Sequence, residues 1–348
     1  MTSTGSGDDA VAPAAGATRA HPRKAATIYD IAQLAGVDPS TVSRALSKPG
    51  RINAITAQKI QEAARSLNYR VNPAARALPT GRTRTIGLIV SDITNPVFFD
   101  IVRGAEQEAA NQNYTLVLAE SRESNDTELL TAHRLLPSVD GLILATSRLD
   151  SEQIQELADE KPVVVLNRVV DGVESVVADV DAGVGQAVEH LAGLGHRRVG
   201  YLPGPERSWV SGRRGEAIAR QCAQRDIEVT MLPAARPMME GGRQSAGDVL
   251  AAGVTALFTY NDLQAIGLLL ELTATGTRVP DGLSIIGFDD IFGADFTTPP
   301  LTTVAAPHAE TAASAARSIL ARLDGEERPA SGAHLRTELV VRGSTGPA

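Results

Sequence analysis

The sequence is poor in the residues that define disulfide-rich, multi-cysteine metal and membrane proteins. Its 348 residues include one cysteine, Cys222, which excludes an internal disulfide and any metal site built from several cysteines. No apolar run approaches the roughly 20 residues that a membrane span requires. The N-terminus, rich in Ser, Gly, Ala and Pro, lacks the apolar core of a secretory signal. We therefore expect a protein that stays in the cytoplasm.

Motifs for catalysis are also missing. The chain has no glycine-rich phosphate loop with Lys and Ser or Thr, no G-x-S-x-G motif, and no pair of histidines at metal-binding spacing. The acids Asp289 and Asp290 are adjacent in sequence, so they do not face each other as an acid/base pair should. We expect no enzymatic activity, no metal and no cofactor.

The net charge of −8 is divided unevenly along the chain. Residues 27–84 contain nine Lys or Arg and three acids, which gives this segment a charge of about +6. Residues 1–26 add about +1, so the remainder carries about −15. A basic N-terminal part on an acidic body indicates attraction to phosphates at one end only. The alternative is a basic surface that is merely solvated.

Residues 27–46, TIYDIAQLAGVDPSTVSRAL, predict two short helices across a tight turn. Thr27 is a suitable N-cap, and Asp30 can complete a shortened capping box. Gly36 permits the positive φ that ends the first helix. The predicted inward face of this helix consists of Ile31, Leu34 and Ala35.

A second helix is predicted to begin at Pro39, because Asp38 is a good N-cap and proline costs nothing at the first helical position. Its buried face is expected to hold Val42, Ala45 and Leu46. Its outward face is polar and consists of Pro39, Ser40, Thr41, Ser43, Arg44 and Ser47. Such a face suits a helix that lies in the major groove of DNA, although an ordinary amphipathic hairpin shows similar short patterns.

This run, with its Asp-Ile-Ala, Ala-Gly-Val and Thr-Val-Ser-Arg segments, resembles the headpiece of LacI-type bacterial transcriptional regulators, and the resemblance continues along most of the chain. It implies that Pro39, Ser40 and Arg44 read bases while Thr41 and Ser43 meet phosphates. Arg44 can donate two hydrogen bonds to guanine, a contact worth roughly 1–3 kcal/mol of discrimination. Pro39 departs from the larger polar residues often found at its position. The full set of expected DNA-binding residues is Tyr29, Pro39, Ser40, Thr41, Ser43, Arg44, Arg76 and Leu78.

The segments around this headpiece have distinct expected roles. Residues 1–26 have no periodicity and are expected to be a disordered tail, whereas residues 27–71 form the headpiece, with a third helix capped by Asn53. Residues 72–83 are too short for an isolated helix. The resemblance implies a hinge helix there, which forms on the operator and inserts Leu78 into the minor groove, and a plain linker is the alternative. Pro79, where the family often has a basic residue, would end this helix abruptly.

From residue 84 to about 345, short β-branched runs alternate with amphipathic helices, the signature of a parallel α/β sheet. Two such sets in tandem predict two doubly wound lobes that face a cleft. This resembles the periplasmic-binding-protein fold of LacI-type sensors. The expected boundaries are 84–165 and 294–323 for the first lobe, and 166–293 and 324–345 for the second.

Polar residues follow most of the predicted strands, where open parallel sheets bind their ligands. Carboxylates, amides and guanidinium groups satisfy sugar hydroxyls in pairs, and Trp209 could stack on an apolar sugar face. The resemblance supports ligand contact at Asn95, Arg168, Asn261, Asp289 and Arg214, although Asn167 stands where many sugar sensors have Asp. The expected ligand-binding residues are Asp92, Asn95, Phe98, Thr146, Arg168, Trp209, Arg214, Asn261 and Asp289.

The combined features favour a transcriptional repressor whose operator affinity is controlled by a small carbohydrate bound between two lobes. One reading helix covers only half of a two-fold operator, so a homodimer is expected on double-stranded DNA. The alternatives are a sugar-binding protein without DNA regulation, or a regulator that responds to a non-sugar metabolite such as a nucleoside. The first alternative predicts a secretory signal and no basic head, and the sequence shows the reverse.

Overall fold

The computed structural model describes residues 26–47, 50–69, 81–326 and 335–348. The chain divides into two compact units, residues 1–76 and residues 77–348, and each is described by itself. The expected tail and most of the expected hinge, including Arg76 and Leu78, lie outside the described residues. None of the described helices has the length and apolar character needed to cross a membrane.

The described residues of the first unit form three helices, α1 (Ile28–Ala35), α2 (Pro39–Ser47) and α3 (Ala54–Ser66). Their common core is small and is made by Ile31, Ala32, Val42, Ile60 and Ala63. The prediction that Leu34 belongs to this core is wrong, because its side chain is 57% exposed. At 100° per residue, the inward side of α1 is centred on Ile31, Ala32 and the half-buried Ala35, and position 34 points about 110° away from the centre of that side.

The second unit begins with a five-stranded parallel sheet in the order β2-β1-β3-β4-β5. Its strands are β1 (Thr85–Val90), β2 (Thr115–Glu120), β3 (Gly141–Ala145), β4 (Val163–Leu166) and β5 (Glu174–Val176). Its helices are α5 (Val97–Asn111), α6 (Asn125–Leu135), the 3-10 helix η1 (Leu136–Ser138), α7 (Ser151–Glu160) and α13 (His308–Leu323). Strand β3 is buried along its whole length, which explains its uninterrupted apolar sequence.

A six-stranded sheet follows, in the order β11-β10-β9-β8-β6-β7. Its strands are β6 (Arg198–Leu202), β7 (Glu228–Met231), β8 (Ala256–Thr259), β9 (Ser284–Asp289), β10 (Thr302–Ala305) and β11 (Glu338–Val340). Its helices are α8 (Val180–Gly193), α9 (Trp209–Ala223), α10 (Met239–Gln244), α11 (Ala246–Ala251) and α12 (Asp262–Ala274). All pairs are parallel except β10 with β11.

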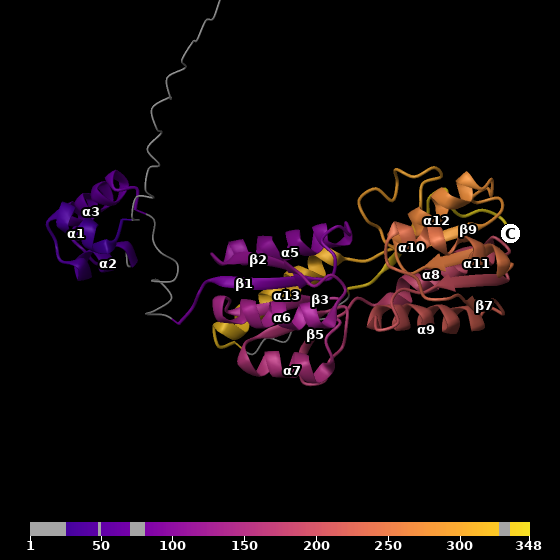
Figure 1. The fold of residues 1–348 in the computed structure, drawn as a ribbon, viewed down its shortest axis with the longest axis horizontal. Coiled ribbons are helices and arrows are strands. Elements are labelled where there is room, and N and C mark those ends of the chain that lie inside the picture. Colours follow the sequence, from indigo (N-terminus) through magenta and orange to yellow (C-terminus); the bar gives the residue numbers. More distant parts are fainter. Residues whose placement is uncertain (1–25, 48–49, 70–80, 327–334) are drawn as a thin grey trace, which may run out of the picture. The chain divides into compact units, whose positions relative to one another are not determined.

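Each sheet is covered by helices on both faces (Figure 1). In the first lobe, α5 and α13 pack on one face, while α6 and α7 pack on the other. In the second lobe, α8 and α9 cover one face, and α10, α11 and α12 cover the other. The expected fold class, an all-α headpiece followed by two doubly wound α/β lobes, is confirmed.

The expected lobe boundaries differ from the strand pairing in two places. Strand β5 lies after residue 166 yet pairs with β4, so the first sheet extends to Val176. Strand β10 lies after residue 294 yet pairs with β9 and β11 in the second sheet. The chain therefore returns to the first lobe only at α13, which packs on α5 and on β4. Sequence periodicity carries no information on which sheet a strand joins.

Candidate functional site

Helix α2 is stabilised by local contacts at its start. The Asp38 carboxylate accepts a hydrogen bond from the Ser40 backbone N–H at 2.8 Å. Hydrogen bonds from Ser40 lower the pKa of Asp38 below its ordinary value. On α1, Thr27 and Asp30 form the predicted capping box. The two-helix hairpin thus follows directly from residues adjacent in sequence.

The outward face of α2 is accessible for DNA contact. Ser40, Ser43 and Arg44 are exposed, whereas Pro39 and Thr41 are half-buried. Val42, on the opposite side, is completely buried and anchors the helix to the headpiece core. On α1, Tyr29 is 69% exposed. The helix geometry therefore presents the predicted polar row away from the core.

In the second unit, a cavity of about 440 Å³ lies beside the segments that link the two lobes. Its lining is Asn167, Val169, Val177, Ala178, Asp179, Val180, Asp181, Trp209, Val210, Arg213, Arg214, Phe288, Val304, Ala306, His308 and Thr337. Nine of these sixteen residues are apolar and seven are polar or charged. Such a combination is typical of a small-molecule site.

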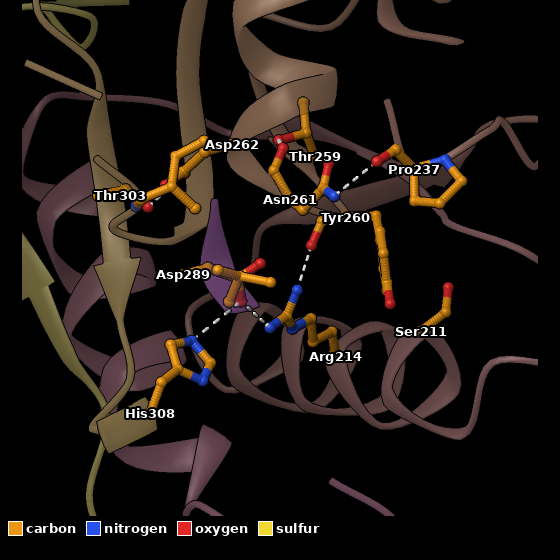
Figure 2. A network of polar contacts seen from close by, with 12 residues as sticks. Ser211, Arg214, Pro237, Thr259, Tyr260, Asn261, Asp262, Asp289, Thr303 and His308 are labelled. Atoms are coloured by element: carbon orange, nitrogen blue, oxygen red, sulfur yellow. Dashed lines mark hydrogen bonds and ion pairs between the residues drawn. The ribbon is translucent and has the colours of Figure 1, made fainter. Parts of the chain in front are cut away.

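One of the lining residues, Arg214, belongs to a buried ion pair. The Arg214 Nη2 lies 2.5 Å from Asp289 Oδ1, and both side chains are less than a tenth exposed. Arg214 Nη1 also donates to the Tyr260 backbone carbonyl, and the guanidinium stacks 4.4 Å from the centre of the Phe288 ring. Figure 2 shows Arg214 between Tyr260 and Asp289, with His308 on the far side of the carboxylate. Arg214 is therefore fixed in position.

The electrostatics of the pair follow from its burial. Burial alone would raise the pKa of Asp289, but the nearby Arg214 and His308 outweigh it and lower that pKa to about 2. Burial opposes the charge on Arg214, yet Asp289 raises the pKa of Arg214 above its ordinary value. Both groups are consequently charged at neutral pH. An ion pair in this position costs desolvation energy and requires good geometry to persist.

His308, at the start of α13, was not among the predicted site residues. Its Nε2 lies 3.6 Å from Asp289 Oδ1, too long for a hydrogen bond. His308 Nε2 and Arg214 Nε are two of the three buried side-chain atoms in the described residues that have no hydrogen-bond partner. Because buried polar groups are normally satisfied, these two atoms are exceptions, and both belong to side chains that line the cavity. Its position shortly after the strand Thr302–Ala305 was the available signal, because ligands bind beyond the carboxyl ends of parallel strands.

The predicted ligand residues are spread over several environments. Trp209 and Arg214 line the cavity, together with Asn167, whereas Asp289 does not line it and is connected to it through its ion pair with Arg214. Asp92 lines a second cavity of about 590 Å³, together with Glu123 of the first lobe and Pro237 of the second. Phe98 is 3% exposed and packs in the core of the first lobe.

Other predicted residues hold local structure instead of lining the cavity. The Asn95 Oδ1 accepts from the Val97 N–H at the start of α5. Arg168 donates to the Leu149 carbonyl and to the Ser151 hydroxyl, and the Thr146 hydroxyl bonds to Ser91. Asn261, 2% exposed, caps α12 through the Gln264 N–H and donates to the Pro237 carbonyl.

Asp262 is a buried carboxyl that supports the same region. It accepts from the Thr303 hydroxyl at 2.6 Å and from the Ile291 N–H at 2.9 Å. Burial and the neighbouring Asp289 raise its pKa well above the ordinary value. A Cβ at Gly287 would lie 2.0 Å from Asp262 Oδ1, so only glycine leaves room for the carboxyl there.

Backbone strain marks the ends of three strands. Thr146 after β3, Asn167 after β4 and Asp289 at the end of β9 have φ values of 58°, 58° and 102°. Residues other than glycine rarely adopt positive φ values, and those that do often occur at binding sites. The strain supports the expectation that ligands bind at the carboxyl ends of these strands.

The sequence has relatives that cover almost its whole length. Residues 27–72 match the bacterial regulatory proteins of the lacI family, and residues 188–345 match a periplasmic binding protein-like domain. The HTH-type transcriptional repressor CytR of Escherichia coli (strain K12) is 32% identical over 329 residues, which cover 92% of this chain and 96% of that protein. The chain belongs to the LacI family. It is therefore a DNA-binding transcriptional regulator and not an enzyme.

Solved LacI-family structures share the architecture. The lac repressor dimer bound to operator and the anti-inducer ONPF superposes with a TM-score of 0.82 at 26% identity, covering 93% of this chain and 100% of that one. The complex of the transcriptional regulator CelR with cellobiose has a TM-score of 0.68 at 27% identity, covering 92% and 99%. The expected family and the expected DNA-regulatory function are confirmed.

Proposed function

We propose that this LacI-family protein represses transcription from a two-fold operator and that a small carbohydrate in the 440 Å³ cavity controls its operator affinity. The observation that carries the proposal is the cavity itself, whose lining combines the Trp209 indole with the polar side chains of Arg214 and His308. A sugar offers hydroxyls to polar side chains and an apolar ring face to an indole. The CelR–cellobiose complex supports a sugar as the effector.

DNA recognition is assigned to the exposed face of α2. Pro39, Ser40 and Arg44 contact bases, Thr41 and Ser43 contact phosphates, and Tyr29 adds a contact from α1. Arg44 provides most of the discrimination, because its guanidinium can donate two hydrogen bonds to one guanine. Arg76 and Leu78 are assigned to the hinge, with Leu78 as a minor-groove wedge.

A homodimer completes the site on DNA. One α2 helix spans half of a two-fold operator, so specific binding requires a second headpiece. The lac repressor structure is a dimer on its operator, which supports the same arrangement here. Closing the two lobes around the effector would shift the first lobes of the dimer and change the spacing of the hinges.

A second effector class is favoured by the apolar part of the cavity. Trp209 and Phe288 lie among several valines, including Val177 and Val304. A nucleoside offers a flat heterocycle for such surfaces and a ribose for Arg214 and His308. Both classes belong in the same screen.

Thermal-shift screening of the full protein against monosaccharides, disaccharides and nucleosides tests the effector. A ligand at about 100 times its dissociation constant adds roughly 2.7 kcal/mol to folding stability. The expected result is a stabilising sugar that also changes operator affinity in a gel-shift titration. Stabilisation by nucleosides alone would favour the second class, and no effect of any stabilising ligand on DNA binding would contradict effector control.

A further inference from the structure

Residues 82–84, which we call the hinge end, lie directly before β1 and overlap the end of the segment 72–83 that we assign to the hinge. The Asp140 carboxylate, 4% exposed, accepts hydrogen bonds from the Thr83 backbone N–H at 2.7 Å and from the Thr83 hydroxyl at 2.9 Å. It also accepts from the Arg84 backbone N–H at 2.9 Å. Three bonds to one buried carboxylate fix residues 83 and 84 on the first lobe.

Arg82 adds a contact between the hinge end and a different element. Its guanidinium donates to Asp324 Oδ1 at 2.8 Å and to the Leu323 backbone carbonyl. Leu323 is the last residue of α13 and Asp324 is the C-cap of that helix. The last carbonyls of a helix have no partner within the helix, and they carry partial negative charge that favours a cation. Arg82 therefore caps α13 from a distant part of the chain.

The opposite end of α13 reaches the cavity. The helix begins at His308, which lines the cavity and whose Nε2 lies 3.6 Å from Asp289 Oδ1 on β9 of the second lobe. Because α13 has 16 residues, it is about 24 Å long. A single helix thus joins the cavity to the residues that Arg82 contacts.

Helix α13 is firmly held in the first lobe between these two ends. A Cβ at Gly104 of α5 would lie 2.0 Å from the Ala309 carbonyl oxygen, so the backbones of the two helices are in direct contact. In the last turn of α13, Arg322 donates to the Val163 carbonyl of β4 at 3.3 Å. We therefore expect a displacement of the first turn of α13 to be transmitted to its last turn.

We propose that Arg82 is a positioning residue that makes the hinge end follow α13, so that the cavity and the DNA-binding hinge influence each other. The inference rests on the proposed function, because it assigns a route to the effector control exerted from the same cavity. Coupling between two sites is reciprocal, so if cavity occupancy changes operator affinity, operator binding changes the cavity. The route is therefore testable from the DNA side, without a known effector.

Trp209 reports on the cavity from the second lobe. It is the only tryptophan in the sequence, it is half-buried, and it lines the cavity together with His308 of the first lobe. A shift of α13 relative to the second lobe therefore changes the surroundings of the indole. The test records Trp209 emission and acrylamide quenching in the full-length, effector-free protein, before and after saturation with an operator duplex selected from a random DNA library with the same protein. We expect operator binding to change both signals, and unchanged signals would overturn the route.

The test variant is Arg82→Gln, and Arg84→Gln is its matched control. Arg84 is an exposed arginine of the same hinge end, but its guanidinium contacts the Tyr114 ring at 5.4 Å and the Gln112 carbonyl at 3.3 Å, neither of which belongs to α13. At saturating operator, Arg82→Gln should lose most of the Trp209 change, and Arg84→Gln should keep it. Operator affinity should fall by at most about fivefold in Arg82→Gln, the scale of a partly exposed ion pair, so saturation stays attainable. A full Trp209 change in Arg82→Gln would overturn the proposal.

Asp324→Ala tests the same contact from the helix side. The Asp324 side chain is 64% exposed, so its loss should cost little folding stability. The variant should lose a smaller part of the Trp209 change, because the Leu323 carbonyl remains available to Arg82. Adding Asp324→Ala to Arg82→Gln should have little further effect, since both substitutions remove one contact, and fully additive losses would overturn the pairing.

These readouts separate the inference from the proposed function. They need no effector, so a failed effector screen leaves them interpretable. If the screen identifies an effector, the factor by which it changes operator affinity should move towards one in Arg82→Gln and stay unchanged in Arg84→Gln. The same factor in Arg82→Gln and in the unmodified protein would contradict the route.

Discussion

The headpiece and the sensor place their functional side chains in opposite environments. On α2, Ser40, Ser43 and Arg44 are exposed, and the headpiece core beneath them contains five buried apolar residues. In the sensor, Arg214 and Asp289 are almost fully buried and paired at 2.5 Å. An exposed helix can contact the phosphates and base edges of DNA, whereas a site for a small ligand must enclose the ligand.

This difference has energetic consequences. An exposed residue such as Arg44 can be replaced at little cost in folding free energy, so its substitution should alter function alone. Removing one member of a buried ion pair leaves the other charge without compensation. Substitutions at the sensor site should therefore change both ligand binding and folding stability. Substitutions on the DNA-binding face of the headpiece should change DNA binding with little effect on folding stability. The following experiments test that contrast, starting with the largest expected effect.

Replacing Asp289 by Ala should destabilise the sensor by about 3–5 kcal/mol, because the Arg214 guanidinium would stay buried without its carboxylate. Urea unfolding of the full protein measures the loss. The control is Asp100→Ala, which removes a 58% exposed carboxylate from a surface pair with Arg103 and should cost about 0–1 kcal/mol. Equal effects of the two substitutions would contradict the importance of burial.

Arg44→Ala should remove roughly 1–3 kcal/mol of discrimination at one operator base pair while leaving sensor stability unchanged. Binding to a series of single-base operator variants measures the change. Arg65→Ala removes the same charge from an exposed position on α3 and should weaken all sequences about equally. A base preference that survives in Arg44→Ala would show that another residue reads that position.

The acid stability of the sensor should depend on Asp289. Its pKa is about 2 in the folded protein, below the ordinary value of 3.8. The pairing therefore contributes about 2 kcal/mol above pH 4, and this contribution is lost as pH falls through about 2. Urea unfolding at pH 5 and pH 2.5 should show a smaller loss of stability in Asp289→Asn than in the unmodified protein. Identical losses would contradict the depressed pKa.

The smallest effect is expected at the headpiece cap. Thr27→Ala removes the capping box of α1 and should cost about 1 kcal/mol. Hydrogen-exchange protection of the α1 amides in the full protein measures this loss. Gln61→Ala, an exposed substitution within α3, serves as the control and should leave protection unchanged. Equal protection in both variants would show that the cap contributes nothing measurable.

Prediction from sequence succeeds where neighbouring residues determine the outcome. The capping box at Thr27 and the start of α2 at Pro39 depend on contacts within four residues, and both are present. The predicted alternation of strands and helices after residue 84 is also present, as at the buried strand β3. The prediction that Leu34 is buried was wrong, because the side of a two-turn helix that faces the core is determined by the helices that pack against it.

The cavity was harder to predict because it depends on contacts between distant segments. Trp209 and Arg214 were expected there and line it, yet Asn261 was expected there and instead caps α12. His308 joins the site only because α13 begins beside Asp289, more than 90 residues after Arg214. The position of a residue directly after a strand shows that it lies at the end of the sheet where ligands bind. It does not show whether the side chain faces the cavity or makes a local hydrogen bond.

The most direct test of the account is operator affinity measured with and without a ligand that stabilises the sensor. Fluorescence anisotropy with labelled operator DNA at fixed salt gives both dissociation constants in one experiment. The account predicts that saturating ligand changes operator affinity by about 5-fold to 150-fold, the usual range of coupling between two sites. Equal affinity for the operator in the presence and absence of bound ligand would contradict it.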